Sequence, residues 1–193
     1  MGLRKGLKAE DLRRCSRTLM LMRHAKTGRQ GSQGDRSRQL TDRGQRQARI
    51  MGRGLTALGL VPDRIICSGA PRARQTLDGM LKPLGDGPRV DYRESLYESG
   101  MQAVFDELAQ TEDRDRRVLI LGHEPTMSIC SQWLAEDNSD PDLLDLLNLG
   151  LPPATMVLLG SERPLTDWGT HQARLLGILG PRTLKTDRRT RRR

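Results

Sequence analysis

Three short apolar runs in this chain each lead directly into residues that can bind or attack an anion. The runs, with the side chains that follow them, are 19–22 before Arg23 and His24, 65–67 before Arg72, and 118–121 before His123. Uninterrupted apolar runs of this length are typical of strands buried on both faces of a parallel sheet. In open α/β sheets, ligands bind in the crevice outside the carboxyl ends of the strands. We therefore expect these strand ends to converge on one crevice.

Helical patterns separate the apolar runs. Thr41 is the expected N-cap of a helix, and Pro71 suits the first turn of another. The alternation predicts an α/β fold: a three-layer αβα sandwich whose mostly parallel, doubly wound sheet has helices on both faces. Whether one or two edge strands run antiparallel stays open. Further elements are expected as a short strand within 90–97, a helix at 104–108, a helical turn at 143–147, a strand at 154–159, and closing strand segments at Trp168 and 175–179.

The length of 193 residues suits one domain, which we place at 18–184. Residues 1–17 are expected to be a polar, basic extension outside the core, and 185–193 a basic, disordered tail. The three cysteines are odd in number and widely spaced, which favours reduced thiols in a cytoplasmic protein over disulfides or a zinc site. The apolar runs are far too short for a membrane span, so we expect no membrane partner. The oligomeric state stays open.

The net charge of +9 lies entirely at the two ends of the chain. The excess is in 1–17 and 185–193, whereas 18–184 carries equal numbers of basic and acidic side chains. This distribution argues against a specific nucleic-acid surface, although loose binding through the tails remains an alternative. Within the body, residues 18–74 have twelve basic and three acidic side chains, which would draw an acidic ligand to this half.

Arg23, His24, Arg72 and His123 would form a phosphoryl-transfer site if they meet. Two guanidiniums match the geometry and charge of phosphate oxygens. One imidazole can attack phosphorus in line with the leaving group, while the other donates a hydrogen bond to an oxygen. Catalysis would come from positioning and charge stabilisation, without a metal or cofactor.

Five segments then carry a resemblance to a known family. In chain order they are LMLMRHAKT, DRSRQLTDRG, IICSGAPRARQT, LILGHEP and LPPATMVLL. Together they resemble the histidine phosphatase superfamily, also called phosphoglycerate mutase-like, and more closely its small phosphohistidine phosphatase branch. The similarity runs from about residue 18 to about 184. It implies that His24 is the nucleophile that becomes phosphohistidine, that Arg23 and Arg72 form the phosphate pocket, and that His123 is its second histidine.

The resemblance leaves two parts of the site less defined. Arg38 matches an arginine that can approach the phosphate in this branch, but Gln39 stands where a proline is usual. Glu98 is the candidate general acid by position; Glu94 and Glu124 are rivals, and an exposed loop carboxylate is an equal interpretation of Glu98. An alkoxide leaving group needs a positioned acid, worth roughly 10²- to 10⁴-fold in rate. Imidazole, with a pKa near 6.5, leaves with far less help, so a site without an acid favours phosphohistidine.

We predict a metal-independent phosphatase that acts through phosphohistidine on His24, with phosphohistidine in a protein as its substrate. Its partner is then a phosphorylated protein or a small phosphorylated molecule, and no specific nucleic acid. One alternative is a small-molecule or nucleotide phosphomonoesterase that uses Glu98 as its acid. Another, from a different class, is an inactive module that binds phosphorylated ligands.

Overall fold

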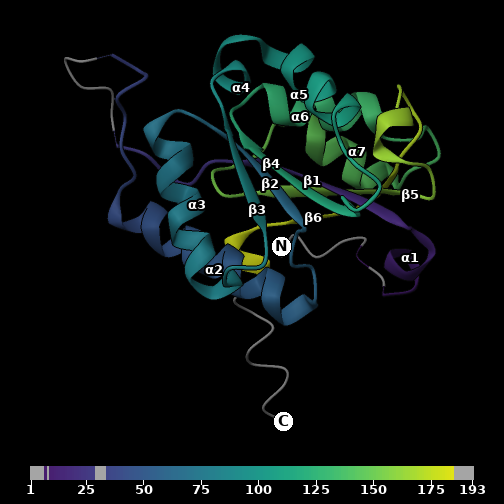
Figure 1. Cartoon of the computed structure of the whole chain (residues 1–193), viewed down its shortest axis with the longest axis horizontal. Coiled ribbons are helices and arrows are strands. Elements are labelled where there is room, and N and C mark those ends of the chain that lie inside the picture. Colours follow the sequence, from purple (N-terminus) through teal and green to yellow (C-terminus); the bar gives the residue numbers. More distant parts are fainter. Residues whose placement is uncertain (1–6, 8, 29–33, 185–193) are drawn as a thin grey trace.

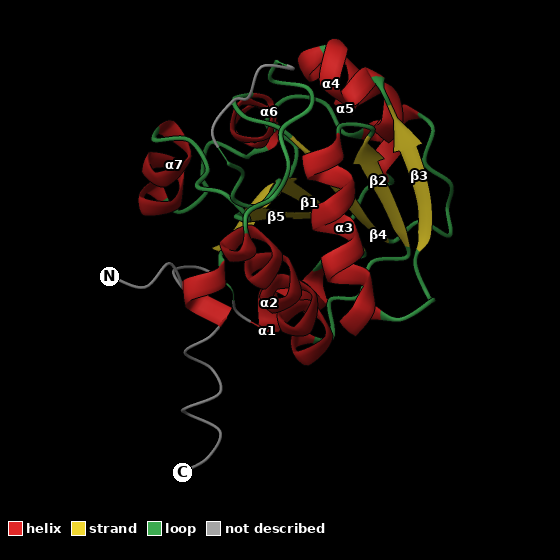
Figure 2. Ribbon diagram, turned by 90° about the vertical axis from the view of Figure 1, so that its left-hand side faces the viewer, coloured by secondary structure: helices red, strands yellow, loops and turns green. Residues whose placement is uncertain are grey.

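The computed structural model describes residue 7 and residues 9–28 and 34–184, and a six-stranded sheet forms its centre (Figures 1 and 2). The strands lie in the order β3-β2-β4-β1-β5-β6. All are parallel except β5, which pairs antiparallel with both β1 and β6. The predicted α/β class with a mostly parallel sheet is confirmed, and the one antiparallel strand is internal. The strands are β1 (Arg17–Arg23), β2 (Arg64–Ser68), β3 (Arg89–Arg93), β4 (Arg117–Gly122), β5 (Met156–Ser161) and β6 (Arg174–Leu179).

Helices cover both faces of the sheet, as predicted. In Figure 2, α2 and α3 lie on one face, and Figure 1 shows α4 to α7 gathered on the other. Alternate residues of β1 explain why both faces need cover, because Leu19 and Leu21 pack toward α4–α7 while Met20 and Met22 pack toward α2 and α3. The helices are α1 (Ala9–Arg14), α2 (Asp42–Leu58), α3 (Pro71–Leu84), α4 (Ser95–Glu98), α5 (Gly100–Ala109), α6 (Thr126–Leu134) and α7 (Pro141–Asn148).

The start of α2 is fixed by its cap and by a close approach to the chain after β1. Thr41 caps the helix, its hydroxyl accepting from the Gly44 amide at 3.1 Å. A Cβ at position 44 would collide with the backbone of Lys26, so only glycine lets the first turn lie this close. At the other end Gly59 has φ 68°, the left-handed conformation that commonly ends helices. These constraints place the N-terminus of α2 beside the carboxyl end of β1.

Three expectations differ from the structure. Residues 1–17 are expected outside the core, yet Leu12 of α1 and Cys15 after it are partly buried against the core cluster that also contains residues of α2 and α3, because their apolar side chains pack there. Trp168 lies in no strand; it follows a short 3-10 helix at Leu165–Asp167 and is buried. The turn expected at 143–147 is the full helix α7, which Asp140 caps. The tail at 185–193 lies outside the described residues.

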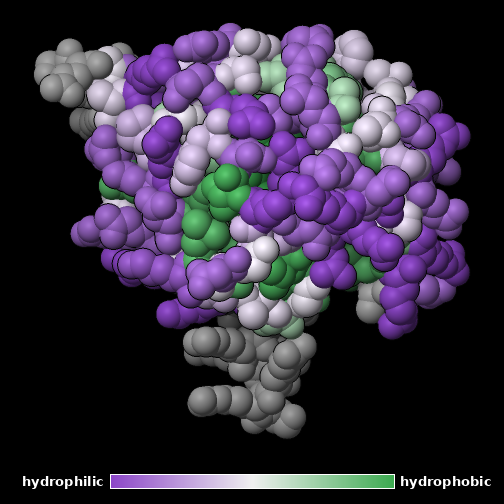
Figure 3. Space-filling view, viewed as in Figure 1, coloured by the Kyte–Doolittle hydropathy of each residue, from purple (hydrophilic) through white to green (hydrophobic). Residues whose placement is uncertain are grey.

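None of the three cysteines is in a disulfide. Burial raises the pKa of both Cys67 and Cys130 to about 12, which keeps these thiols protonated and unreactive. Among the described residues no helix is both long and apolar enough to cross a membrane. The face shown in Figure 3 is mainly hydrophilic, with hydrophobic atoms visible between α3 and β3.

Candidate active site

His24 is held directly after β1 with one ring nitrogen directed to a carbonyl. Its backbone amide donates to the Gly122 carbonyl, and its carbonyl accepts from the Ala154 amide, each at 3.0 Å. Nδ1 lies 2.8 Å from the carbonyl oxygen of Ala25, so Nδ1 carries the proton and Nε2 keeps a lone pair. Burial, reinforced by neighbouring arginines, lowers the pKa of His24 to about 4. The imidazole is therefore neutral at pH 7 and able to act as a nucleophile.

Arg72 brings its guanidinium to this lone pair. It lies in the first turn of α3, directly after Pro71, and is 4% exposed. Its Nε donates to Nε2 of His24 at 3.2 Å. Its two terminal nitrogens donate to Asp35, one to the carbonyl oxygen and one to the carboxylate, both at 2.8 Å. Asp35 thus holds the far edge of the guanidinium and leaves its Nε side facing Nε2 of His24.

Arg23 and His123 each present a buried nitrogen without a partner. Arg23 Nη1 donates to the Leu151 carbonyl at 2.6 Å, but its Nε has no partner. His123 Nε2 lies 2.8 Å from the Ser68 hydroxyl, while its Nδ1 has none. These are the only buried side-chain nitrogens lacking a hydrogen bond in the described part of the chain. Since buried polar groups nearly always have partners, both nitrogens mark a place for a ligand or water.

The two histidine rings face the same space. Their centroids are 5.3 Å apart, and burial, followed by the charge of Arg72, lowers the pKa of His123 to about 3. A neutral ring has one N–H. If the Ser68 hydroxyl donates to Nε2, the proton is on Nδ1, which makes the unpartnered atom a hydrogen-bond donor.

Asp35 and Tyr97 also belong to this cluster, although the sequence analysis assigned neither a role. The Tyr97 hydroxyl lies 3.3 Å from the Asp35 carboxylate, and its ring meets the His123 ring edge-on at 5.3 Å. A hydrogen bond from Arg38 lowers the pKa of Asp35 despite partial burial, so the carboxylate is ionised. The only local feature of the sequence that could have pointed to Asp35 is its spacing of three residues from Arg38, which lets the two side chains pair. Tyr97 comes from α4, and nothing in the sequence around it indicates a role in the site.

Arg38 lies near the cluster, but its N–H groups donate to residues of the neighbouring loop. It bonds to the Asp35 carboxylate at 2.9 Å, and also to the Thr27 hydroxyl and the Gly28 carbonyl. Its charge is close enough to contribute to the lowered pKa of His24. Its contact with a phosphate stays a prediction.

The candidate acids lie elsewhere. Glu98 pairs with Arg36 at 3.1 Å, and its side chain is 56% exposed. Glu94 pairs with the same arginine. Glu124 accepts from the Leu151 amide and the Ser128 hydroxyl. None of the three contacts His24, whose side-chain hydrogen-bond partners in the described structure are Ala25 and Arg72. No cluster of metal-ligating side chains occurs in the described ranges.

Comparison with known proteins assigns the chain to a family. The model of the histidine phosphatase superfamily (branch 1) matches residues 19–101. An uncharacterized protein of Mycobacterium tuberculosis is 32% identical over 162 residues, which are 83% of this chain and all of that protein. The chain belongs to the histidine phosphatase superfamily and is a phosphatase.

Solved structures place it more narrowly. A Nakamurella multipartitia protein provisionally named phosphohistidine phosphatase SixA is 31% identical, with a TM-score of 0.73 over 86% of this chain and 96% of that one. A protein of Agrobacterium tumefaciens with the same provisional name is 25% identical, with a TM-score of 0.71 over 86% of this chain and 99% of that one. The protein is thus a member of the small, SixA-like branch, which confirms the resemblance found in the sequence.

Proposed function

We propose that the protein is a phosphohistidine phosphatase that acts on phosphorylated protein through a covalent intermediate on His24, without a metal ion. The observation that carries the proposal is the pair of buried, unpartnered nitrogens, Arg23 Nε and His123 Nδ1, in the cluster around the neutral nucleophile. With Arg72 they supply donors for the oxygens of a phosphoryl group. Arg38 is the further candidate phosphate ligand.

The proposed reaction has two displacements at phosphorus. Arg72 Nε moves its hydrogen bond from Nε2 of His24 to an oxygen of the bound phosphoryl group, which frees the Nε2 lone pair. Nε2 then forms a bond to phosphorus as the P–N bond to the substrate imidazole breaks, and that imidazole leaves with a proton acquired from solvent. Water then attacks phospho-His24, inorganic phosphate leaves, and the lone pair returns to Nε2. The three donors stabilise the charge on the equatorial oxygens in both steps.

The choice of phosphohistidine over an ester rests on the missing acid. Glu98, Glu94 and Glu124 are engaged with other groups, and Asp35 is held ionised, so it has no proton to give. A phosphate ester would leave as an alkoxide and requires protonation. An imidazole does not require this help to the same degree. We also infer a cytoplasmic location, which three cysteines without a disulfide support.

The test compares kcat/KM for free phosphohistidine and for an aryl phosphate ester, with chelator present. His24→Ala should lower turnover of phosphohistidine by about 10³-fold or more. His171→Ala is the matched control, because His171 lies away from the site and bonds to the Ala135 carbonyl. Ester hydrolysis equal to or faster than phosphohistidine hydrolysis would move the function to phosphomonoesters. A phosphohistidine activity that survives His24→Ala would refute the mechanism.

A further inference from the structure

A basic cavity lies apart from the cluster around His24. Its volume is about 450 Å³, and no carboxylate lines it among the described residues. Four cations line it: Lys26, Arg43, Arg46 and Arg182. The first three form no ion pair with any carboxylate in the described part of the chain, and all are exposed. The cavity accounts for part of the basic excess in residues 18–74, which the catalytic site does not use.

The backbone ties this cavity to the nucleophile. Lys26 is two residues after His24, and two residues of chain span at most about 7 Å. The opposite wall comes from residues 152–155, a segment whose Ala154 amide bonds to the His24 carbonyl and whose Thr155 carbonyl accepts from the Arg23 amide. The remaining walls are the first turns of α2 and residues 180–183 after β6. All of them lie at the edge of the sheet where β1 and β6 end.

Two of the cations that line the cavity lie next to one another on α2. Arg43 and Arg46 are three residues apart, so they are neighbours on the helix surface, and like charges at this spacing repel. An isolated guanidinium is satisfied by water, but several cations around one carboxylate-free cavity create a positive potential that concentrates anions. The walls between them include Pro152, Pro153 and Ile50, which suit aliphatic stems rather than a fully hydrated ion.

We propose that this cavity binds acidic side chains of the phosphoprotein substrate, close in sequence to its phosphohistidine. The inference rests on the proposed function, since it names which phosphohistidine proteins the site accepts. An extended segment advances about 3.3–3.6 Å per residue, so carboxylates a few residues from the phosphohistidine can reach these cations. Each exposed ion pair contributes modestly, so recognition needs several carboxylates rather than one.

An acidic protein segment fits better than a nucleic acid. No aromatic side chain lines the cavity among the described residues, whereas single-stranded nucleic acids bind largely by stacking on aromatic rings. The cavity wall at 152–155 is also bonded to the backbone of Arg23 and His24, so a protein segment that binds there lies near the proposed nucleophile. A phosphorylated protein uses both places at once.

The test uses the full chain and three substrates. They are free phosphohistidine, a phosphohistidine peptide with glutamates on both sides of the phosphorylated residue, and the same peptide with glutamines instead. The test variant is Arg43→Gln with Arg46→Gln. Its matched control is Arg49→Gln with Arg53→Gln, which removes two charges from the same helix outside the cavity. Binding of the unphosphorylated glutamate peptide to His24→Ala, measured by fluorescence anisotropy, gives a readout that needs no turnover.

We expect the wild type to prefer the glutamate peptide and Arg43→Gln/Arg46→Gln to lose about tenfold of that preference, because each exposed pair changes affinity by up to about fivefold. Turnover of free phosphohistidine should not change, and the preference should shrink as salt is raised.

Equal turnover of the two peptides by the wild type would overturn the cavity proposal, as would an equal loss in the Arg49→Gln/Arg53→Gln control. An oligonucleotide that binds His24→Ala more tightly than the glutamate peptide, and loses this in the Arg43→Gln/Arg46→Gln background, would assign the cavity to nucleic acid instead. Failure of all three phosphohistidine substrates to turn over would refute the proposed function, whereas the peptide-binding measurement would still test the cavity.

Discussion

Arg64 and Arg72 are both buried arginines next to β2, but they differ in the number of carboxylates around them. Arg64 opens the strand, where Asp91 binds it at 2.7 Å and Asp115 and Glu107 lie at 3.6 and 3.8 Å. Arg72 follows the other end of the strand and has a single carboxylate partner. The difference separates a charge that is neutralised within the fold from one that is kept for a ligand.

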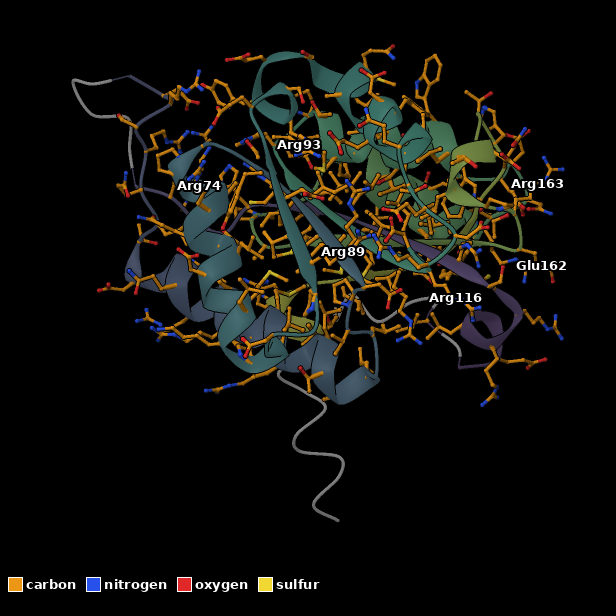
Figure 4. The ribbon with its side chains drawn as sticks, in the orientation of Figure 1. Arg74, Arg89, Arg93, Arg116, Glu162 and Arg163 are labelled. Atoms are coloured by element: carbon orange, nitrogen blue, oxygen red, sulfur yellow. The ribbon has the colours of Figure 1, made fainter. Side chains whose placement is uncertain are left out.

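The cluster around Arg64 is completed from β3, the strand at the sheet edge. Figure 4 shows Arg89 and Arg93 on this strand. Arg93 bonds to Glu107 at 2.7 Å, and Arg89 pairs with Asp115. Each of the three arginines in this cluster, Arg64, Arg89 and Arg93, meets at least one carboxylate, so their charges are neutralised within the fold. In the cluster around His24, the two arginines Arg23 and Arg72 outnumber the one carboxylate that pairs with them, Asp35. This leaves a net positive charge, which an anionic substrate requires.

The largest expected effect is a loss of stability when the Arg64 cluster is broken. Arg64→Met leaves Glu107 and Asp115 buried with fewer countercharges, and removal of one partner of a buried ion pair typically costs about 3–5 kcal/mol. Urea titration should show this loss in the free energy of unfolding. Arg114→Met, which removes only an exposed pair with Glu112, should cost less than about 1 kcal/mol. A loss from Arg64→Met as small as that of the control would show that the cluster is not a stabilising unit.

The next largest effect concerns catalysis. Arg72→Lys keeps the charge but loses the planar fork that binds Asp35 and faces His24, so kcat/KM for phosphohistidine should fall about 10²- to 10³-fold. The melting temperature should change little. Arg74→Lys is the control on the same helix, since Arg74 stacks over the Tyr92 ring instead. If the lysine variant retained full activity, Arg72 would act only as a point charge.

A change of pH should have an intermediate effect on the stability of the fold. The pKa of His24 is about 4 and that of His123 about 3, both below the value of 6.5 for an unfolded histidine. Between these values the unfolded chain takes up protons that the folded protein does not, so stability falls as pH drops below about 6.5. From pH 7 to pH 5 each histidine should account for roughly 1–2 kcal/mol.

Thermal melts at several pH values measure this effect by difference between variants. His123→Gln should reduce the loss of stability between pH 7 and pH 5, because one titrating group is gone. Identical pH dependence in the wild type and His123→Gln would contradict the lowered pKa of His123.

The smallest effect is expected at Glu98. Its exposed pair with Arg36 should contribute less than about 1 kcal/mol to stability. Glu98→Gln should therefore change kcat/KM for phosphohistidine by less than about threefold, within the energy of such a pair. A much larger loss, confined to an aryl phosphate ester, would identify Glu98 as a general acid after all and would sharpen the distinction between the two substrate classes.

The sequence predicted those parts of the molecule that local signals encode. Thr41 as a cap, Pro71 at a helix start and the apolar runs gave the elements and their order, and the strand-end pattern brought His24 and Arg72 to one place. Contacts between distant segments were not predictable. Nothing near Arg64 indicates that three carboxylates from other segments surround it, and nothing near Asp35 indicates that it binds a residue 37 positions away. Such pairs depend on the tertiary packing, which no spacing reveals.

The two unpartnered nitrogens also bear on how the reaction ends. In the proposed mechanism Arg23 Nε and His123 Nδ1 donate to oxygens on phosphorus, and inorganic phosphate carries the same oxygens as the group that arrives on the substrate. A pocket that recognises only this group binds what it releases as well as what it receives. The proposed mechanism therefore predicts that inorganic phosphate inhibits the enzyme as a product. Selectivity for one phosphorylated partner has to come from outside the phosphate pocket.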